Sequence, residues 1–138
     1  MKLIILDRDG VINFDSDAYI KSPAEWQPIP GSLQAIARLN QQGYRVAVAT
    51  NQAAISRGLF DMKMLCAIHH KLHQSAQAVS ARIDAIFYCP YAAEEQCDCR
   101  KPRPGMLLAI GKRFGVALQD VPMVGDSLRD LQAAIQVG

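Results

Sequence analysis

Short apolar runs alternate with amphipathic stretches along this chain. Residues 3–6, 44–50, 83–89 and 121–126 are short and mostly apolar, which is typical of strands buried on both faces of a sheet. Between and after them, apolar residues recur at spacings of three and four, which predicts helices. The predicted helices cover residues 32–42, residues 61–79 with Asp61 as N-cap, residues 104–114, and a stretch that begins near Leu128.

Strands that alternate with helices need crossover connections, and these predict a doubly wound, mostly parallel α/β sheet. The 138 residues are enough for a single domain, residues 1–138. We expect no large cap domain, because the segments after Asp9 and Thr50 hold short loops and one helix. The last strand–helix unit looks incomplete, since the chain stops at Gly138.

The composition is that of an ordinary soluble domain, with 50% hydrophobic and 20% charged residues. A net charge of +2 is too small to indicate nucleic acid or an anionic membrane as partner. The sequence has neither a run long enough to span a membrane nor a signal-peptide pattern. We therefore expect a cytoplasmic protein, and a monomer.

Chemically distinctive residues follow the predicted strands. Asp7 and Asp9 follow the first strand, and Thr50, Asn51 and Gln52 end the second. Asp126 follows the last strand, and the pair Arg100-Lys101 precedes the helix at 104. Each has an ordinary explanation when taken singly, as a turn, a helix cap or a solvated charge. In a parallel sheet, however, the carboxyl ends of the strands lie along one edge, so these side chains converge. Carboxylates, a hydroxyl and a lysine together indicate a site for Mg²⁺ and phosphate.

The order of these motifs resembles that of the haloacid dehalogenase superfamily of phosphotransferases, over nearly the whole chain. The four motifs of the superfamily correspond to "DRDGV", Thr50, Lys101 and "GDS". The stretches "DRDGVIN", "ATNQAAISRG" and "CDCRKPRPGM" are similar to one branch, the heptose bisphosphate phosphatases and the related histidinol-phosphate phosphatases. The resemblance implies a Rossmann-like core.

The resemblance also implies a Mg²⁺-dependent phosphatase that works through an aspartyl-phosphate. Asp7 would be the nucleophile, and Asp9 would protonate the leaving group and then activate water. Thr50 would orient a phosphoryl oxygen, and the ammonium of Lys101 would offset the repulsion between carboxylate and phosphate. Asp7, Asp126 and the main-chain carbonyl of Asp9 would hold Mg²⁺.

The substrate implied by the resemblance is a small phosphorylated sugar, D-glycero-D-manno-heptose 1,7-bisphosphate, with histidinol phosphate as the alternative. Arg100 would hold the remote phosphate, and Asn51 and Arg57 are further candidates for that role. A degenerate member of the fold that binds without catalysis also remains open. A receiver-type signalling domain is excluded, because its paired acids, phosphorylated Asp, Thr and Lys follow a different order along the chain.

Cys89, Cys97 and Cys99 lie just before Arg100-Lys101. In the resembled branch this loop carries structural zinc with a Cys-x-His half and a Cys-x-Cys half. Here Tyr91 stands where the histidine is expected, and structural zinc almost always takes four ligands. The three cysteines are therefore either zinc ligands or three reduced thiols in a compact loop.

The helix at 61–79 carries further residues that could hold a metal. His69 and His73 are four residues apart, but no carboxylate partner is evident nearby, so we expect a solvated or partly buried helix face. Cys66 lies near the apolar stripe of this helix, and we expect it in the core.

Overall fold

The computed structural model describes residues 2–16, 19–90, 100–101, 103–119, 121–125 and 128–137. Within them the chain forms a four-stranded sheet with the order β3-β2-β1-β4. All three strand pairings are parallel, as the alternating pattern predicts. The strands are β1 (Lys2–Leu6), β2 (Tyr44–Asn51), β3 (Ala85–Cys89) and β4 (Met123–Val124).

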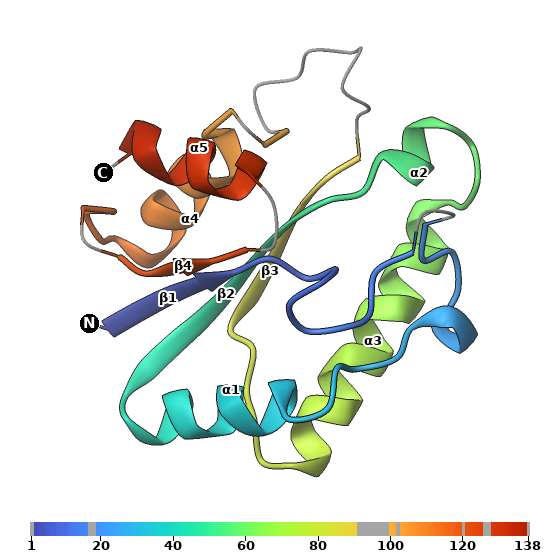
Figure 1. Ribbon diagram of the computed structural model, residues 1–138, viewed down its shortest axis with the longest axis horizontal. Helices are drawn as coiled ribbons and strands as arrows, with labels where there is room; N and C mark the ends of the chain where they lie inside the picture. The colour runs from blue at the N-terminus through green and yellow to red at the C-terminus, as the bar shows by residue number, and fades with distance from the viewer. Residues whose placement is uncertain are drawn as a thin grey trace.

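Helices cover both faces of the sheet, so the fold is doubly wound (Figure 1). Helices α1 (Ser32–Gln41) and α3 (Met62–Ala78) lie on one face, and α4 (Gly105–Phe114) and α5 (Leu128–Val137) lie on the other. The pattern of apolar residues did not predict two short helices, α2 (Ala53–Ser56) and the 3-10 turn η1 (Pro23–Glu25). In the described ranges, no helix is both long and apolar enough to cross a membrane.

The core has two layers because successive side chains of a strand point to opposite faces. In β2, Val46 and Val48 pack with the residues buried under α1 and α3. Ala47 and Ala49 pack with the residues buried under α4, including Leu107. β1 divides in the same way, so both central strands are buried on both faces, which explains their continuous apolar runs.

Helix α3 has the predicted start and the predicted buried stripe. The side chain of Asp61 accepts a hydrogen bond from the amide of Met64, and the residues buried along the helix are Leu65, Ile68, Leu72 and Ala76. The prediction that Cys66 belongs to the core is wrong, because this residue is exposed. It lies one position beyond Leu65, which turns it away from a stripe that advances by three or four residues.

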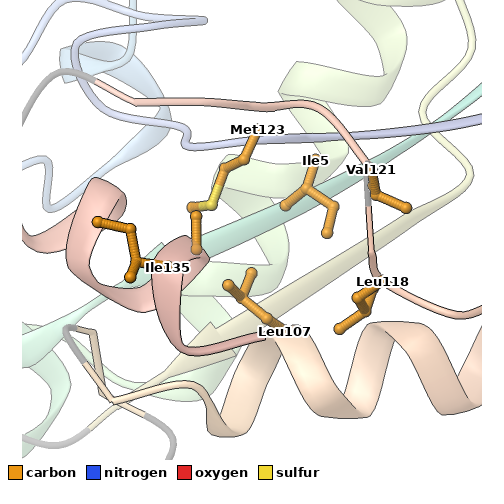
Figure 2. Close-up of a pocket in the computed structure, with 7 residues that line it drawn as sticks. Ile5, Leu107, Leu118, Val121, Met123 and Ile135 are labelled. Carbon is orange, nitrogen blue, oxygen red and sulfur yellow. The ribbon is translucent and has the colours of Figure 1, made fainter. Parts of the chain in front are cut away.

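An apolar pocket of about 180 Å³ lies where α4 and α5 meet the sheet (Figure 2). Its described lining is entirely apolar and comprises Ile5, Leu107, Leu118, Val121, Met123, Ala134 and Ile135. A lining without a titratable or polar side chain offers nothing for acid–base or metal chemistry, so the candidate site has to be sought at the polar edge of the sheet.

Leu107 and Leu108 provide a matched test of this core. Leu107 is 1% exposed and its neighbour Leu108 is 54% exposed. We expect Leu107→Ala to lower the free energy of unfolding by about 2–5 kcal/mol, because it leaves a cavity under the sheet. Leu108→Ala should change it by less than about 0.5 kcal/mol. Equilibrium urea unfolding measures both, and equal losses would contradict the assignment of the core.

Candidate functional site

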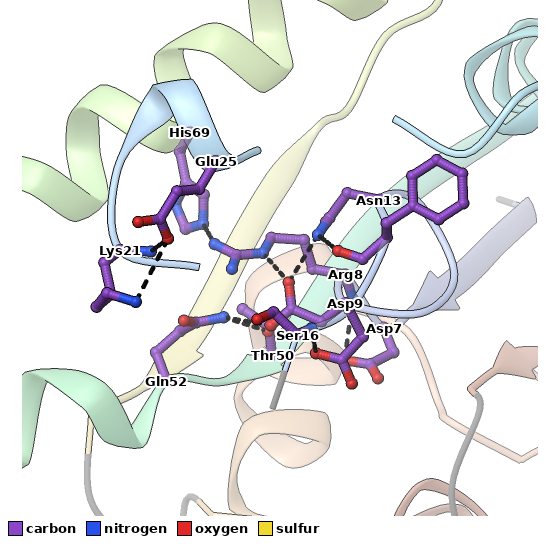
Figure 3. Close-up of polar contacts among 12 residues, drawn as sticks. Asp7, Arg8, Asp9, Asn13, Ser16, Lys21, Glu25, Thr50, Gln52 and His69 are labelled. Atoms are coloured by element: carbon purple, nitrogen blue, oxygen red, sulfur yellow. Dashed lines mark hydrogen bonds and ion pairs between the residues drawn. The ribbon is translucent and has the colours of Figure 1, made fainter. Parts of the chain in front are cut away.

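The predicted site residues converge at the carboxyl end of β1. This strand lies between β2 and β4, so the chain leaves it towards one side of the sheet and returns on the other. Such a switch point is where open α/β sheets bind ligands. Asp7 follows β1 directly, and Thr50 lies beside it near the end of β2 (Figure 3). Lys101 reaches the same point from the segment that precedes α4.

Lys101 is buried, with its side chain 3% exposed. Its ammonium donates to Oδ1 of Asp7 at 3.0 Å, to the main-chain carbonyl of Ala49 at 2.9 Å and to Oδ1 of Asp130 at 2.5 Å. An ammonium has three N–H donors, and all of them are used here. The side-chain Nδ2 of Asn51 donates to the main-chain carbonyl of Lys101, and Oδ1 of Asn51 accepts from the backbone N–H of Lys101. These two hydrogen bonds fix the backbone of Lys101.

The two oxygens of the Asp7 carboxylate differ in their hydrogen bonds to the described residues. Oδ1 accepts from Lys101 and from the backbone N–H of Arg8 at 2.9 Å. Within the described residues, Oδ2 accepts no hydrogen bond. Burial raises the pKa of Asp7 from 3.8 to about 6, an effect that the charge of Asp130 increases and that of Lys101 opposes. This carboxylate is therefore poised to gain from a further positive charge.

Asp130 is a site residue that our sequence analysis missed. It lies in the first turn of α5, is 2% exposed, and forms an ion pair with Lys101. A Cβ added to Gly125 would come within 2.3 Å of the Asp130 side chain, so glycine is needed where the chain passes this carboxylate. The signal was present in "GDSLRD", because acids four residues apart lie on one side of a helix start.

Asp9 is held by a separate set of contacts. Its Oδ1 accepts from Nε of Arg8 at 2.8 Å and from Nδ2 of Asn13 at 2.9 Å, while Oδ2 accepts from Nε2 of Gln52 at 3.3 Å (Figure 3). Its side chain is 21% exposed, in contrast to the buried Arg8. The two carboxylates of the "DRD" motif thus have different surroundings, one enclosed and one at the edge of the site.

Thr50 is buried, with 1% of the residue exposed. Its hydroxyl oxygen accepts a hydrogen bond from Nε2 of Gln52 at 2.9 Å. A hydroxyl that accepts in this way still has its own hydrogen to donate, and this suits a phosphoryl oxygen. Gln52 links Thr50 to Asp9, and our sequence analysis placed it at the strand end without giving it a role. Its position in the polar run at the end of β2 was the available signal.

Other predicted residues lie further out or outside the described residues. Arg57 is exposed after α2, and Arg100 is half-buried next to Lys101. Asp126, Cys97 and Cys99 fall outside the described residues. Cys89 is buried at the end of β3 and is disulfide-bonded. Across the described part of the chain, no three His, Cys, Asp or Glu side chains are grouped to hold a metal.

The described part of the site nevertheless fits a hard divalent cation. Three carboxylates, Asp7, Asp9 and Asp130, face two cations, Arg8 and Lys101. The described site therefore has an excess of negative charge, and Asp7 has an open oxygen. Mg²⁺ takes oxygen ligands and commonly binds through one or two carboxylates together with phosphate oxygens.

A family model described as haloacid dehalogenase-like hydrolase matches residues 11–138. The D-glycero-beta-D-manno-heptose-1,7-bisphosphate 7-phosphatase of Bordetella bronchiseptica is 59% identical over 138 residues, which are all of this chain and 77% of that protein. The enzyme of the same name from Pseudomonas putida is 54% identical over all of this chain and 79% of its own length.

Solved structures agree with the sequence relatives. The crystal structure of the B. bronchiseptica D,D-heptose 1,7-bisphosphate phosphatase, complexed with magnesium and phosphate, has a TM-score of 0.98 at 59% identity, over all of this chain and 77% of that one. A putative HAD-like phosphatase from Mesorhizobium loti has a TM-score of 0.88 at 36% identity, over all of this chain and 69% of that one. The fold described above is therefore that of the haloacid dehalogenase-like phosphatases.

The raised pKa of Asp7 predicts a specific pH dependence for protein freed of divalent cations with a chelator. The folded state holds the proton more tightly than the unfolded state, so the contribution of Asp7 to stability is present below pH 3.8 and is lost as the pH rises to about 6. Asp7→Asn should remove this loss and stabilise the metal-free protein at pH 7 by about 3 kcal/mol.

Urea unfolding between pH 4 and pH 8 measures this effect. The matched control is Asp84→Asn, which keeps an acceptor oxygen for the amide of Val46 near the start of β2 and leaves the site untouched. An Asp7→Asn variant that is less stable than the wild type at pH 7, with an unchanged pH dependence, would contradict the prediction.

Proposed function

Because this chain belongs to the haloacid dehalogenase-like hydrolase family and is a phosphatase of that family, we propose that it hydrolyses the 7-phosphate of D-glycero-D-manno-heptose 1,7-bisphosphate with Mg²⁺. The observation that carries the proposal is the carboxylate of Asp7, buried beside Lys101, whose Oδ2 accepts no hydrogen bond from the described residues. The names of the relatives and the magnesium and phosphate in the B. bronchiseptica structure support the choice of substrate and cofactor.

The first step is an attack of Oδ2 of Asp7 on phosphorus. The bond between phosphorus and the sugar oxygen breaks, and the carboxyl group of Asp9 gives its proton to that oxygen. Oδ1 of Asp9 accepts from both Arg8 and Asn13, whereas among the described residues Oδ2 accepts only from Gln52, at 3.3 Å, so Oδ2 is the oxygen that carries the proton. The Thr50 hydroxyl donates to a phosphoryl oxygen throughout.

In the second step Asp9 takes a proton from water, which attacks the aspartyl-phosphate. The bond between phosphorus and Asp7 breaks, so inorganic phosphate leaves and the Asp7 carboxylate is restored. Lys101 has no N–H to spare for the substrate, so it acts by holding Asp7 in place and by lowering the negative charge that the phosphate meets.

The metal site would consist of Asp7, the main-chain carbonyl of Asp9, and Asp126. A bound Mg²⁺ would offset the charge of the phosphate and of the transition state, where two unit charges 4 Å apart repel by about 4 kcal/mol at an effective dielectric of 20. The excess of carboxylates over cations among the described residues supports this assignment.

The remainder of a small sugar has room beside the site. An open depression of about 610 Å³ is lined by Lys21 and by residues between Ile55 and Met64. It is tied to the site edge because the amide of Ile55 donates to the main-chain carbonyl of Gln52. We retain Arg57 and Arg100 as candidates for the remote phosphate. Asn51 is a weaker candidate, since its side chain holds Lys101.

Phosphate release from the heptose bisphosphate and from histidinol phosphate, each with Mg²⁺ and with chelator, tests the proposal. We expect Mg²⁺-dependent release from the heptose bisphosphate, and phosphorus NMR of the product should show that the 7-phosphate has been removed. Faster release from histidinol phosphate would favour that alternative. No release from either compound, with both still bound, would indicate a non-catalytic binding module.

Asp7→Asn tests the nucleophile. An amide is a poor nucleophile, so we expect turnover to fall by at least about 10⁴-fold and the phosphoenzyme to disappear in acid-quench trapping. The control is again Asp84→Asn, which lies near the start of β2 and away from the site and should retain wild-type turnover. Turnover of Asp7→Asn within a few-fold of the wild type would refute the assignment.

Zinc bound by Cys89, Cys97 and Cys99 stays a prediction, and the disulfide at Cys89 provides the competing hypothesis. The chain has four cysteines. If zinc is bound, elemental analysis should find about one zinc ion per chain, and all four cysteines should titrate as thiols after denaturation without reductant. A disulfide predicts two thiols and no zinc. Protons compete with zinc for the thiolates, so the amount of bound zinc should fall as the pH drops.

The cytoplasmic location and the monomeric state also stay predictions.

A further inference from the structure

Arg8, the middle residue of "DRD", is fully buried although it belongs to a charged motif. Its Nε donates to Oδ1 of Asp9 at 2.8 Å, and its Nη1 lies 3.2 Å from Nε2 of His69 (Figure 3). Among the described atoms, Nη2 has no hydrogen-bond partner. A buried guanidinium is costly unless it is paired, so each of these two contacts matters for its position.

The contact with His69 determines which form of the imidazole is present. A guanidinium is a donor and never an acceptor, so Nε2 of His69 has to accept and the ring has to be neutral, with its proton on Nδ1. Burial, followed by the charge of Arg8, lowers the pKa of His69 to about 3, in agreement with a neutral ring. The sequence predicts a solvated or partly buried face, and His69 is half-buried, as predicted; the structure adds that it accepts from Arg8.

The position of His69 is set by the core. It follows Ile68, which is 0% exposed and packs against the face of the sheet that α1 and α3 cover. The imidazole therefore stands on a rigid helix and meets Arg8 across 61 residues of sequence. Arg8 in turn meets the carboxylate that our proposed mechanism uses for proton transfer.

We propose that His69 is a positioning residue for Asp9: it anchors Arg8, and Arg8 holds Oδ1 of Asp9 so that Oδ2 faces the leaving group. This inference rests on the proposed function. The two oxygens of Asp9 then have different tasks: Oδ1 is held by Arg8 and Asn13, and Oδ2, which accepts one longer hydrogen bond from Gln52, faces the substrate. His69 itself does not touch the reacting atoms.

A leaving-group comparison distinguishes this role from a purely structural one. Expulsion of a sugar alkoxide needs a proton, whereas a nitrophenolate leaves without one. With Mg²⁺ present, His69→Leu should lower kcat on the sugar phosphate by about 10-fold or more, because small misplacements of catalytic groups are costly, with KM changed by less than about 2-fold. With p-nitrophenyl phosphate only the later hydrolysis of the phosphoenzyme needs Asp9, so the rate of phosphoenzyme formation, followed as the nitrophenolate burst, should fall by less than about 3-fold.

Two variants serve as matched controls. His69→Gln keeps an acceptor oxygen for Arg8 and should retain kcat within about 3-fold of the wild type. His70→Leu changes the adjacent exposed histidine and should leave both substrates unaffected. If His69→Leu does not fold, His69→Met carries the same test, since methionine is also a good helix former without a strong acceptor.

Asp9→Asn provides a double-mutant cycle. If His69 acts through Asp9, His69→Leu should cost less than about 2-fold in kcat in the Asp9→Asn background, far below its cost in the wild type. An equal loss in the nitrophenolate burst rate and in kcat on the sugar phosphate, additive effects in the cycle, or unchanged kinetics of His69→Leu would each overturn the inference. A wild type without Mg²⁺-dependent phosphate release would instead refute the proposed function.

Discussion

The buried ammonium of Lys101 is the contact on which the geometry of the site depends. It joins a carboxylate after β1, a main-chain carbonyl of β2 and a carboxylate in the first turn of α5. A buried charge has to be matched by its acceptors, so these three elements can meet only in one arrangement. The side chain of Asn51 adds a fourth constraint, because it binds the backbone of Lys101 from the end of β2.

This arrangement also sets the charge of the site. One ammonium between Asp7 and Asp130 does not neutralise both, and burial raises the pKa of Asp7 to about 6. The folded protein thus maintains a carboxylate in surroundings that disfavour its charge. Such a group lowers the stability of the folded protein when no cation is bound, and a bound cation removes this cost. Sites that bind metal and phosphate commonly have this property.

Asp9 depends on a second and separate set of contacts. Arg8, Asn13 and Gln52 hold it at the edge, where its side chain is 21% exposed, while Asp7 is enclosed. Two carboxylates one residue apart therefore have different environments. This is the condition under which one can serve as a nucleophile and the other as an acid and base.

Much of the fold and part of the site could be predicted from the sequence, because they depend on local pattern. A period of two or of 3.6 identifies strands and helices, and polar residues that follow buried strands identify the functional edge. Asp7, Thr50 and Lys101 were found in this way, and the structure brings them together. The motif order alone supported the family.

Only the tertiary structure decided which distant side chains complete the site. The link between His69 and Arg8 spans 61 residues, and that between Asp130 and Lys101 spans 29. The exposure of Cys66 also depended on packing, since one helical position separates it from a buried residue. Periodicity shows which face of an element is buried, but the partner of a polar side chain depends on how the elements pack. That packing results from the whole chain, because burial of each charged group requires a partner that another element supplies.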